Sequence, residues 1–159
     1  ATAFVDVDGD GDADAIGPNE LVKSLAIDSG SLHQFQDGQP GTHGIAPTLG
    51  AVGPFRVGFP LEARVTGAMG GALGLLVLGD TPATLNILGG TQYMNTIWST
   101  LFTCGGTPGA VGEGSWTWNV GALPPTLAGV SFYLQAGVAD PQGPGGWART
   151  NPIKVTIGL

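Results

Sequence analysis

Residues 6–14 of this chain carry a carboxylate at every second position, and no other segment has residue types that point as clearly to chemistry. Five of the twelve acidic residues fall in this stretch, at Asp6, Asp8, Asp10, Asp12 and Asp14. Carboxylates placed so closely repel one another unless a cation neutralises them. Because calcium accepts roughly six to eight oxygen ligands at about 2.3–2.6 Å, the spacing predicts a Ca²⁺ loop.

The aspartates match the ligand positions of a calcium loop through its ninth residue. Such a loop offers oxygens at its first, third, fifth, seventh and ninth positions, and here all five are aspartates. Gly11 falls at the sixth position, where the chain turns sharply and a residue without Cβ is favoured. The twelfth position, which supplies a bidentate glutamate in an EF-hand, is Gly17. Asn19, Glu20, water or a neighbouring subunit would therefore have to complete the coordination shell.

The segment FVDVDGDGDADAI at residues 4–16 resembles the calcium loops of FG-GAP and VCBS-type repeats and, more loosely, those of dockerins and thrombospondin type 3 repeats. In the FG-GAP and VCBS-type repeats an aromatic residue precedes the first aspartate by two positions, as Phe4 does, and a hydrophobic residue follows the last, as Ala15 and Ile16 do. The resemblance implies that the five aspartates are calcium ligands. Because this sequence holds one copy, the resemblance implies neither a propeller nor an integrin-like function. The alternative is an acidic turn exposed to water without a metal.

Composition and charge limit the classes of protein to which the chain can belong. The 159 residues suit one domain, and 11% of them are charged, against about a quarter in a typical soluble domain. The net charge of −7 and the five scattered Lys and Arg residues argue against nucleic-acid binding. No run reaches the roughly eighteen apolar residues of a membrane helix, so we expect no membrane insertion. So little charge indicates that the chain either depends on Thr, Ser, Gln and Asn for solubility or is covered by other subunits.

We expect a secreted or cell-surface protein. Extracellular calcium would fill a loop of modest affinity that cytoplasmic calcium would leave largely empty. The opening Ala-Thr-Ala is of the kind left after removal of a signal peptide. Cys104 is the single cysteine, which excludes an intramolecular disulfide and predicts a small buried apolar side chain.

β-Strand patterns separated by Gly and Pro run through the whole sequence. Residues 115–120 alternate between two faces, with Trp116, Trp118 and Val120 on one of them, and residues 153–157 do the same. The sequence predicts an all-β fold, an antiparallel β-sandwich of immunoglobulin-like or jelly-roll-like type over residues 20–159, preceded at 1–19 by a strand, an extended arm and the calcium loop. The expected strands cover residues 3–7, 20–28, 31–36, 55–66, 72–78, 84–88, 91–103, 115–120, 131–138 and 153–159. Residues 37–54, 105–114 and 140–152 are expected to be surface loops.

Residues 122–159 look like the C-terminal half of sandwich domains in bacterial secreted multidomain proteins. The similarity consists of a proline-bounded loop, the segment VSFYLQA at 130–136, a long turn and a closing strand. It implies an extracellular bacterial setting and transfers no binding residue.

The sequence contains no recognisable catalytic constellation, and we expect no enzyme. His33 and His43 lack the closely spaced His or Cys partner of a zinc site. Residues 29–37 include serine, histidine and aspartate, but in one segment without the G-x-S-x-G elbow of a hydrolase. Glu62 and Glu113 would have to meet in space to act as a glycosidase pair, and exposure to water is the simpler explanation.

Aromatic residues are the basis of an alternative function, carbohydrate binding. Most tryptophans lie in cores, but a flat stacking platform would draw on Trp98, Trp116, Trp118, Trp147, Tyr93 and Tyr133. Trp147 follows the segment GPGG, so we expect it at an exposed loop tip, as a contact for a glycan or another subunit.

Together these features predict a non-catalytic, calcium-stabilised structural subunit that self-assembles with its own copies into an extracellular filament or surface layer. The alternative is a carbohydrate-binding or adhesive module of a secreted bacterial protein. Residues 1–7, with Phe4 and Val5 as subunit contacts, would add a strand to the next subunit, because an exposed sheet edge offers unpaired backbone groups. Residues 153–159 are the competing donor, although we expect them to form an ordinary closing strand.

Overall fold

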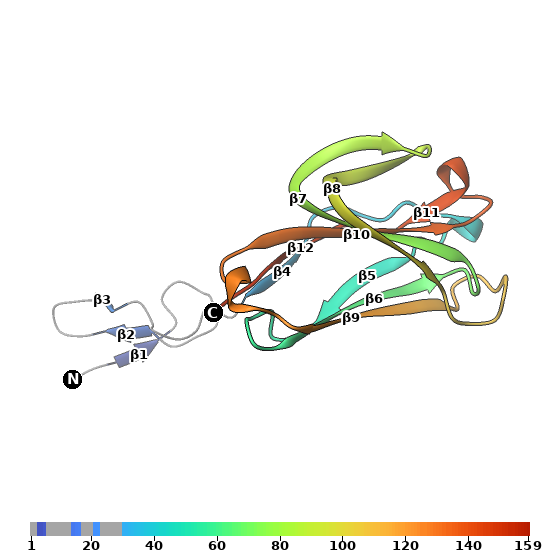
Figure 1. Cartoon of the computed structure of the whole chain (residues 1–159). Helices are drawn as coiled ribbons and strands as arrows, with labels where there is room; N and C mark the ends of the chain where they lie inside the picture. Colours follow the sequence, from blue (N-terminus) through green and yellow to red (C-terminus); the bar gives the residue numbers. More distant parts are fainter. Residues whose placement is uncertain (1–2, 6–13, 17–20, 23–29) are drawn as a thin grey trace.

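The computed structural model describes residues 3–5, 14–16, 21–22 and 30–159, and within them every element longer than three residues is a β-strand. Figure 1 shows two sheets stacked face to face, and all strand pairs in both are antiparallel. The predicted all-β antiparallel sandwich is therefore confirmed.

The larger sheet has six strands. In spatial order it runs through β4 (Ser31–Gln34), β12 (Ile153–Thr156), β10 (Ser131–Ala139), β7 (Leu73–Ile87) and β8 (Gly90–Thr103). The sixth strand, β11 (Trp147–Arg149), pairs with the end of β10. The last strand in the sequence thus lies inside the sheet between β4 and β10, which confirms that residues 153–156 form a closing strand of their own domain.

The smaller sheet contains β5 (Thr48–Val52), β6 (Pro60–Ala68) and β9 (Gly114–Ala122), in that order. Single turns of 3-10 helix lie in the connections at η1 (Thr42–Gly44), η2 (Pro125–Leu127) and η3 (Pro144–Gly146). A third, separate sheet is formed near the N-terminus by β1 (Ala3–Val5), β2 (Asp14–Ile16) and β3 (Leu21–Val22).

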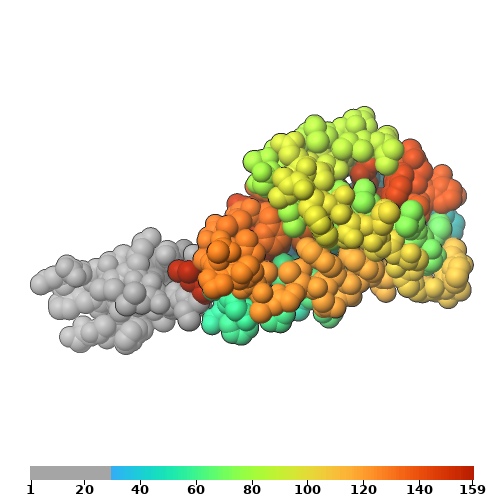
Figure 2. Space-filling model, in the orientation of Figure 1, coloured from blue at the N-terminus to red at the C-terminus, as the bar shows by residue number. Residues whose placement is uncertain are grey.

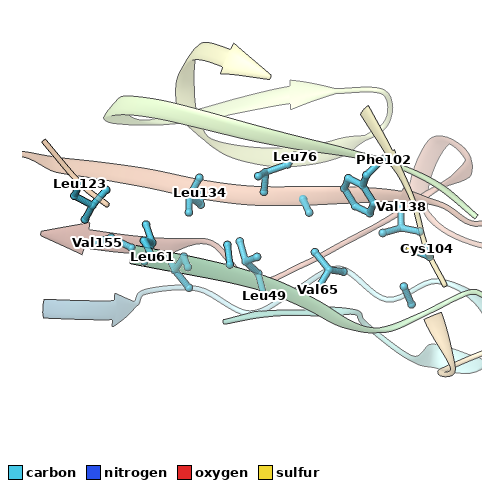
Figure 3. Close-up of a cluster of buried hydrophobic side chains, with 14 of the residues drawn as sticks. Leu49, Leu61, Val65, Leu76, Phe102, Cys104, Leu123, Leu134, Val138 and Val155 are labelled. Atoms are coloured by element: carbon cyan, nitrogen blue, oxygen red, sulfur yellow. The ribbon is translucent and has the colours of Figure 1, made fainter. Parts of the chain in front are cut away.

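The core lies between the two stacked sheets and is built from alternate residues of each strand, because successive side chains of a strand point to opposite faces. In β6, Leu61, Ala63 and Val65 are buried whereas Arg64 and Thr66 are exposed. The predicted alternation of β9 is confirmed, since Trp116, Trp118 and Val120 all pack against the core. Figure 3 shows side chains of the larger sheet facing those of the smaller one across the core, among them Leu76, Leu134 and Phe102 opposite Leu49, Leu61 and Val65. Cys104 is buried in the same cluster, as predicted.

The β7–β8 hairpin is the longest element, and its outer half leaves the larger sheet. β10 pairs with β7 only as far as Gly79, and beyond this residue the register between β7 and β8 shifts repeatedly. The hairpin then curls over the outer face of the sheet (Figure 1), where the backbone N–H of Tyr93 donates to the Gln135 side chain of β10. Gly79 makes the bend possible, because a Cβ at this position would lie 2.3 Å from the carbonyl oxygen of Asn95.

Several sequence predictions need correction. The stretches 37–54 and 140–152, expected to be loops, contain β5 and β11. The strands expected at 72–78 and 84–88 are one bent strand, β7. Of the strand expected at 20–28, the structure describes only β3, which pairs with β2, and the domain boundary expected at residue 19 remains a prediction.

Candidate interaction surface

Most of the predicted calcium site lies outside the described residues. This applies to Asp6, Asp8, Asp10 and Asp12 and to the additional candidates Asn19 and Glu20. Asp14 is described only through its backbone in β2, where it pairs with Val5 of β1. In the part of the chain that the structure does describe, no three His, Cys, Asp or Glu side chains are grouped to hold a metal ion. The calcium loop remains a prediction.

The residues considered for a hydrolytic triad lie in an exposed stretch of chain. Ser31 and His33 are both exposed on the edge strand β4, with His33 opposite Lys154, and Asp37 is exposed in the loop that follows. Among the hydrogen bonds of residues 30–159, none joins these three side chains. Ser29 lies outside the described residues.

Glu62 and Glu113 are too far apart to act as a pair. Glu62 lies opposite Asn119 in the ladder between β6 and β9 and forms an ion pair with Arg64 on the outer face. Glu113 lies six positions from Asn119 along the chain. At about 3.3 Å per residue this places the backbone of Glu113 roughly 20 Å along the strand from the position of Glu62, too far for the carboxylates to come within the 5–9.5 Å or so that glycoside hydrolysis requires.

The aromatic side chains form separate groups and not one platform. Trp98 of β8 stacks on Trp118 of β9, with ring centroids 5.2 Å apart and an angle of 22° between the ring planes. Phe102 and Trp116, also from β8 and β9, stack at 4.1 Å and 11°. These two stacks join β8 and β9, each an outermost strand of its sheet. Figure 2 shows the two segments, in yellow and orange, lying against each other.

Elsewhere, Phe35 packs edge-on against Tyr93 and Tyr133, with centroid distances of 6.4 and 5.8 Å. Trp147 begins β11 and is half-buried, and its ring lies close enough to Gly137 that a Cβ there would be 3.4 Å away. The loop tip itself is formed by the preceding η3 turn. The role of Trp147 as a ligand or subunit contact remains a prediction.

A groove with a volume of about 210 Å³ opens beside the Trp98–Trp118 stack. We call it the apolar groove, because every residue that lines it is hydrophobic: Leu61, Leu78, Ile97, Trp118, Val120, Leu123, Leu127, Val130 and Phe132. Ile97 is 60% exposed at its rim. Such a surface costs free energy when it faces water, roughly 25 cal/mol for each Å² of apolar area.

A β-bulge gives β8 its outward-pointing side chains next to this groove. Leu78 pairs with Trp98, and Gly79 pairs with Thr96, so Ile97 has no partner of its own in β7. An extra residue of this kind re-aims the neighbouring side chains. As a result Ile97 lines the apolar groove while the adjacent Trp98 stacks on Trp118.

Beyond the bulge, residues 98–103 form what we call the β8 edge. They pair with β7 in one uninterrupted register, from Leu78 opposite Trp98 to Leu73 opposite Thr103. On their other side they have no backbone partner within residues 30–159. Natural edge strands are usually protected by lysine, proline or an inward-pointing charge, and the β8 edge has none of these. It also exposes Leu101 to 65% and Trp98 to 42%.

At the opposite end of the domain, polar side chains hold the loops in place. The buried carboxylate of Asp140 accepts hydrogen bonds from the backbone N–H and the hydroxyl of Thr42 and from the backbone N–H of Gln142. Burial by itself raises the pKa of Asp140, but these bonds and the one from Gly143 outweigh it and hold the pKa below the usual value. The carboxylate is fully engaged, so we assign it a structural role.

Comparison with known proteins identifies no relative: no protein family matches the sequence, and no curated protein or solved structure does either. Of the helices in the described ranges, none is long and apolar enough to cross a membrane. The sequence had indicated Trp98 and Trp118 as candidate contacts, but only the sheet order reveals that β8 is an outermost strand.

Proposed function

We propose that this chain is a non-catalytic structural subunit of an extracellular bacterial assembly, whose copies join through the edges of their sheets. One observation carries the proposal: the β8 edge is uncharged and regular, has no backbone partner on its outer side within residues 30–159, and lies beside the apolar groove. Unpaired strand edges with exposed hydrophobic residues are templates for pairing with another chain. A protein with this edge and only 11% charged residues has a surface suited to stable association with other copies of the same chain.

The N-terminal strands offer a second contact of the same type. β1, which contains Phe4 and Val5, is one of the two outermost strands of the sheet β1-β2-β3. Calcium bound by Asp6, Asp8, Asp10, Asp12 and Asp14 would rigidify the connection between β1 and β2. A subunit with two joining edges extends into a filament or layer, because each copy can bind two others.

The test is electron microscopy and sedimentation of the purified protein with calcium and with a chelator. We expect assemblies in calcium that shorten or disperse in chelator, and we expect deletion of residues 1–7 to prevent them. The double variant Asp8→Ala plus Asp10→Ala should lose the rise in melting temperature that calcium produces, because an ion bound only to the folded state stabilises it. Asp37→Ala plus Asp80→Ala, which removes the same charge from exposed positions, is the control and should keep that rise. Dispersed monomers under every condition would contradict the proposal.

Carbohydrate binding is the second candidate, favoured by the partly exposed Trp98 in its stack with Trp118. Aromatic rings of this kind stack on the faces of sugars. Binding to a glycan array that is lost in Trp98→Ala or Trp147→Ala would support this function over assembly. No binding by the wild-type chain would remove it.

A further inference from the structure

We propose that the β8 edge binds the β8 edge of a second copy of this chain, antiparallel and about a two-fold axis, so that the two larger sheets become one continuous sheet. This inference rests on the proposed function, in which copies join through the edges of their sheets. It adds which edge is used and which edge of the second copy it meets. A two-fold contact needs a surface that is complementary to itself, and a single antiparallel strand edge fulfils this condition with its own backbone groups.

The alternation of side chains restricts the register of this pair. Residues directly opposite each other in an antiparallel pair point to the same face of the sheet. In the β8 edge, Phe102 and Trp98 face the core, whereas Leu101 lies on the other face with Ser99 and Thr103. Registers that keep the two faces continuous therefore place odd-numbered residues opposite odd-numbered residues. With Leu101 on the axis, the most exposed side chain of the edge is covered by its own copy.

The absence of charged residues at the β8 edge favours it as the contact between two copies. Each copy carries a net charge of −7, so two copies repel each other wherever acidic residues come close. The whole of β8 and the part of β7 that pairs with the β8 edge contain no charged residue. Two copies that join here bring no like charges into direct opposition.

The other outermost strands of the sandwich are less suitable. The backbone N–H and carbonyl of Leu49 in β5 are already paired with the side chain of Asn151. β4 has four residues and presents His33 opposite Lys154. The outward-facing residues of β9 are polar and gain little by burial. Within residues 30–159, β8 exposes more large apolar side chains (Ile97, Trp98 and Leu101) than β4 does with Leu32 or β5 with Val52, and Ile97 lies next to the β8 edge to contact the partner.

The first measurement is sedimentation of the full chain in the presence of a chelator. The chelator removes calcium, so that the proposed N-terminal contact is not stabilised and association through the β8 edge is measured alone. We expect a dimer. Leu101→Lys should weaken association at least about ten-fold, because two ammonium groups would face each other across the axis. Leu159→Lys, at a residue 64% exposed but remote from β8 in the sequence, is the matched control and should dimerise as the wild type does. Equal association of Leu101→Lys and wild type would overturn the inference.

Disulfide trapping separates this inference from the proposed function. Under mild oxidation, Leu101→Cys should form a covalent dimer, whereas the wild type, whose Cys104 is buried, should not. If Leu101→Cys links only to a second variant, Val5→Cys, then the β8 edge accepts the N-terminal strand; assembly through edges survives and the two-fold pair is refuted. If Leu101→Cys forms no disulfide with itself or with Val5→Cys, and the chain sediments as a monomer with and without calcium, then the two-fold pair and the proposed function are both refuted.

Discussion

Asn151 ties the two sheets of the sandwich together, and its replacement by alanine should be among the most damaging single changes in the chain. Its side-chain oxygen accepts the N–H of Leu49, and its NH₂ group donates to the carbonyl of the same residue, both at 2.9 Å. Asn151 is 4% exposed and Leu49 is 2% exposed, so water cannot easily replace the lost partner. A buried polar group left without a partner costs about 1–3 kcal/mol. With two such groups, Asn151→Ala should reduce the free energy of unfolding by about 2–6 kcal/mol.

Urea denaturation of wild type and variant measures this loss directly. A domain of this size loses roughly 2–4 °C of melting temperature for each kcal/mol, so a thermal scan should show a fall of about 4–24 °C. Asn119→Ala is the control, because this asparagine is exposed on the outer face of β9, and its loss should change stability by less than about 0.5 kcal/mol. An effect of Asn151→Ala no larger than that of Asn119→Ala would refute the reasoning, since it would mean that the backbone of β5 is satisfied by water.

Two further predictions concern Asp140 and Gly74. The pKa of Asp140 is lower in the folded chain than its ordinary value, so this carboxylate stabilises the fold above about pH 4, and the stabilisation is lost as the pH falls through the folded pKa. The melting temperature of Asp140→Asn should therefore fall less on acidification than that of the wild type. An equal fall in both proteins would contradict the structural role assigned to Asp140. In Gly74→Ala the new Cβ would lie 2.1 Å from the ring of Phe102, so calorimetry should show a loss of about 1–3 kcal/mol. Gly50→Ala, whose Cβ would meet nothing within 4 Å, is the control, and an equal loss in both would contradict the packing argument.

The fold could be predicted from sequence wherever one face of a strand is buried and the other is exposed to solvent. β9 and β12 alternate apolar and polar residues along their length, and both were expected close to where they form. β5 was missed because its sequence, TLGAV, alternates weakly and stands in a stretch rich in Gly and Pro. It becomes a strand through its pairing with β6, the next strand, and through Asn151, which lies 102 residues from Leu49 in the sequence. β11 has three residues and forms because β10 offers it a free edge.

The bend in β7 shows a different limit. The segment between Gly79 and Pro82 has the composition of a turn, and the sequence accordingly predicted two strands with a break. Proline is tolerated within β7 because, past Gly79, this strand pairs with β8 alone and needs no donor on its other side. The candidate interaction surface was hidden for a related reason. Trp98 and Leu101 are apolar residues of an apolar strand, and only the spatial order of the strands decides whether such residues are covered.

The place of β12 in the larger sheet has a kinetic consequence. Within residues 30–159, β4, near the beginning of the sandwich, pairs with no strand except β12, which is the last of the sandwich strands to be synthesised. Contacts between residues so distant in sequence form slowly, because a long loop must close before any of them is gained. A chain leaving a ribosome therefore keeps β4 without this partner until β12 has emerged. Chaperones that bind the emerging chain would meet this protein with its larger sheet still open.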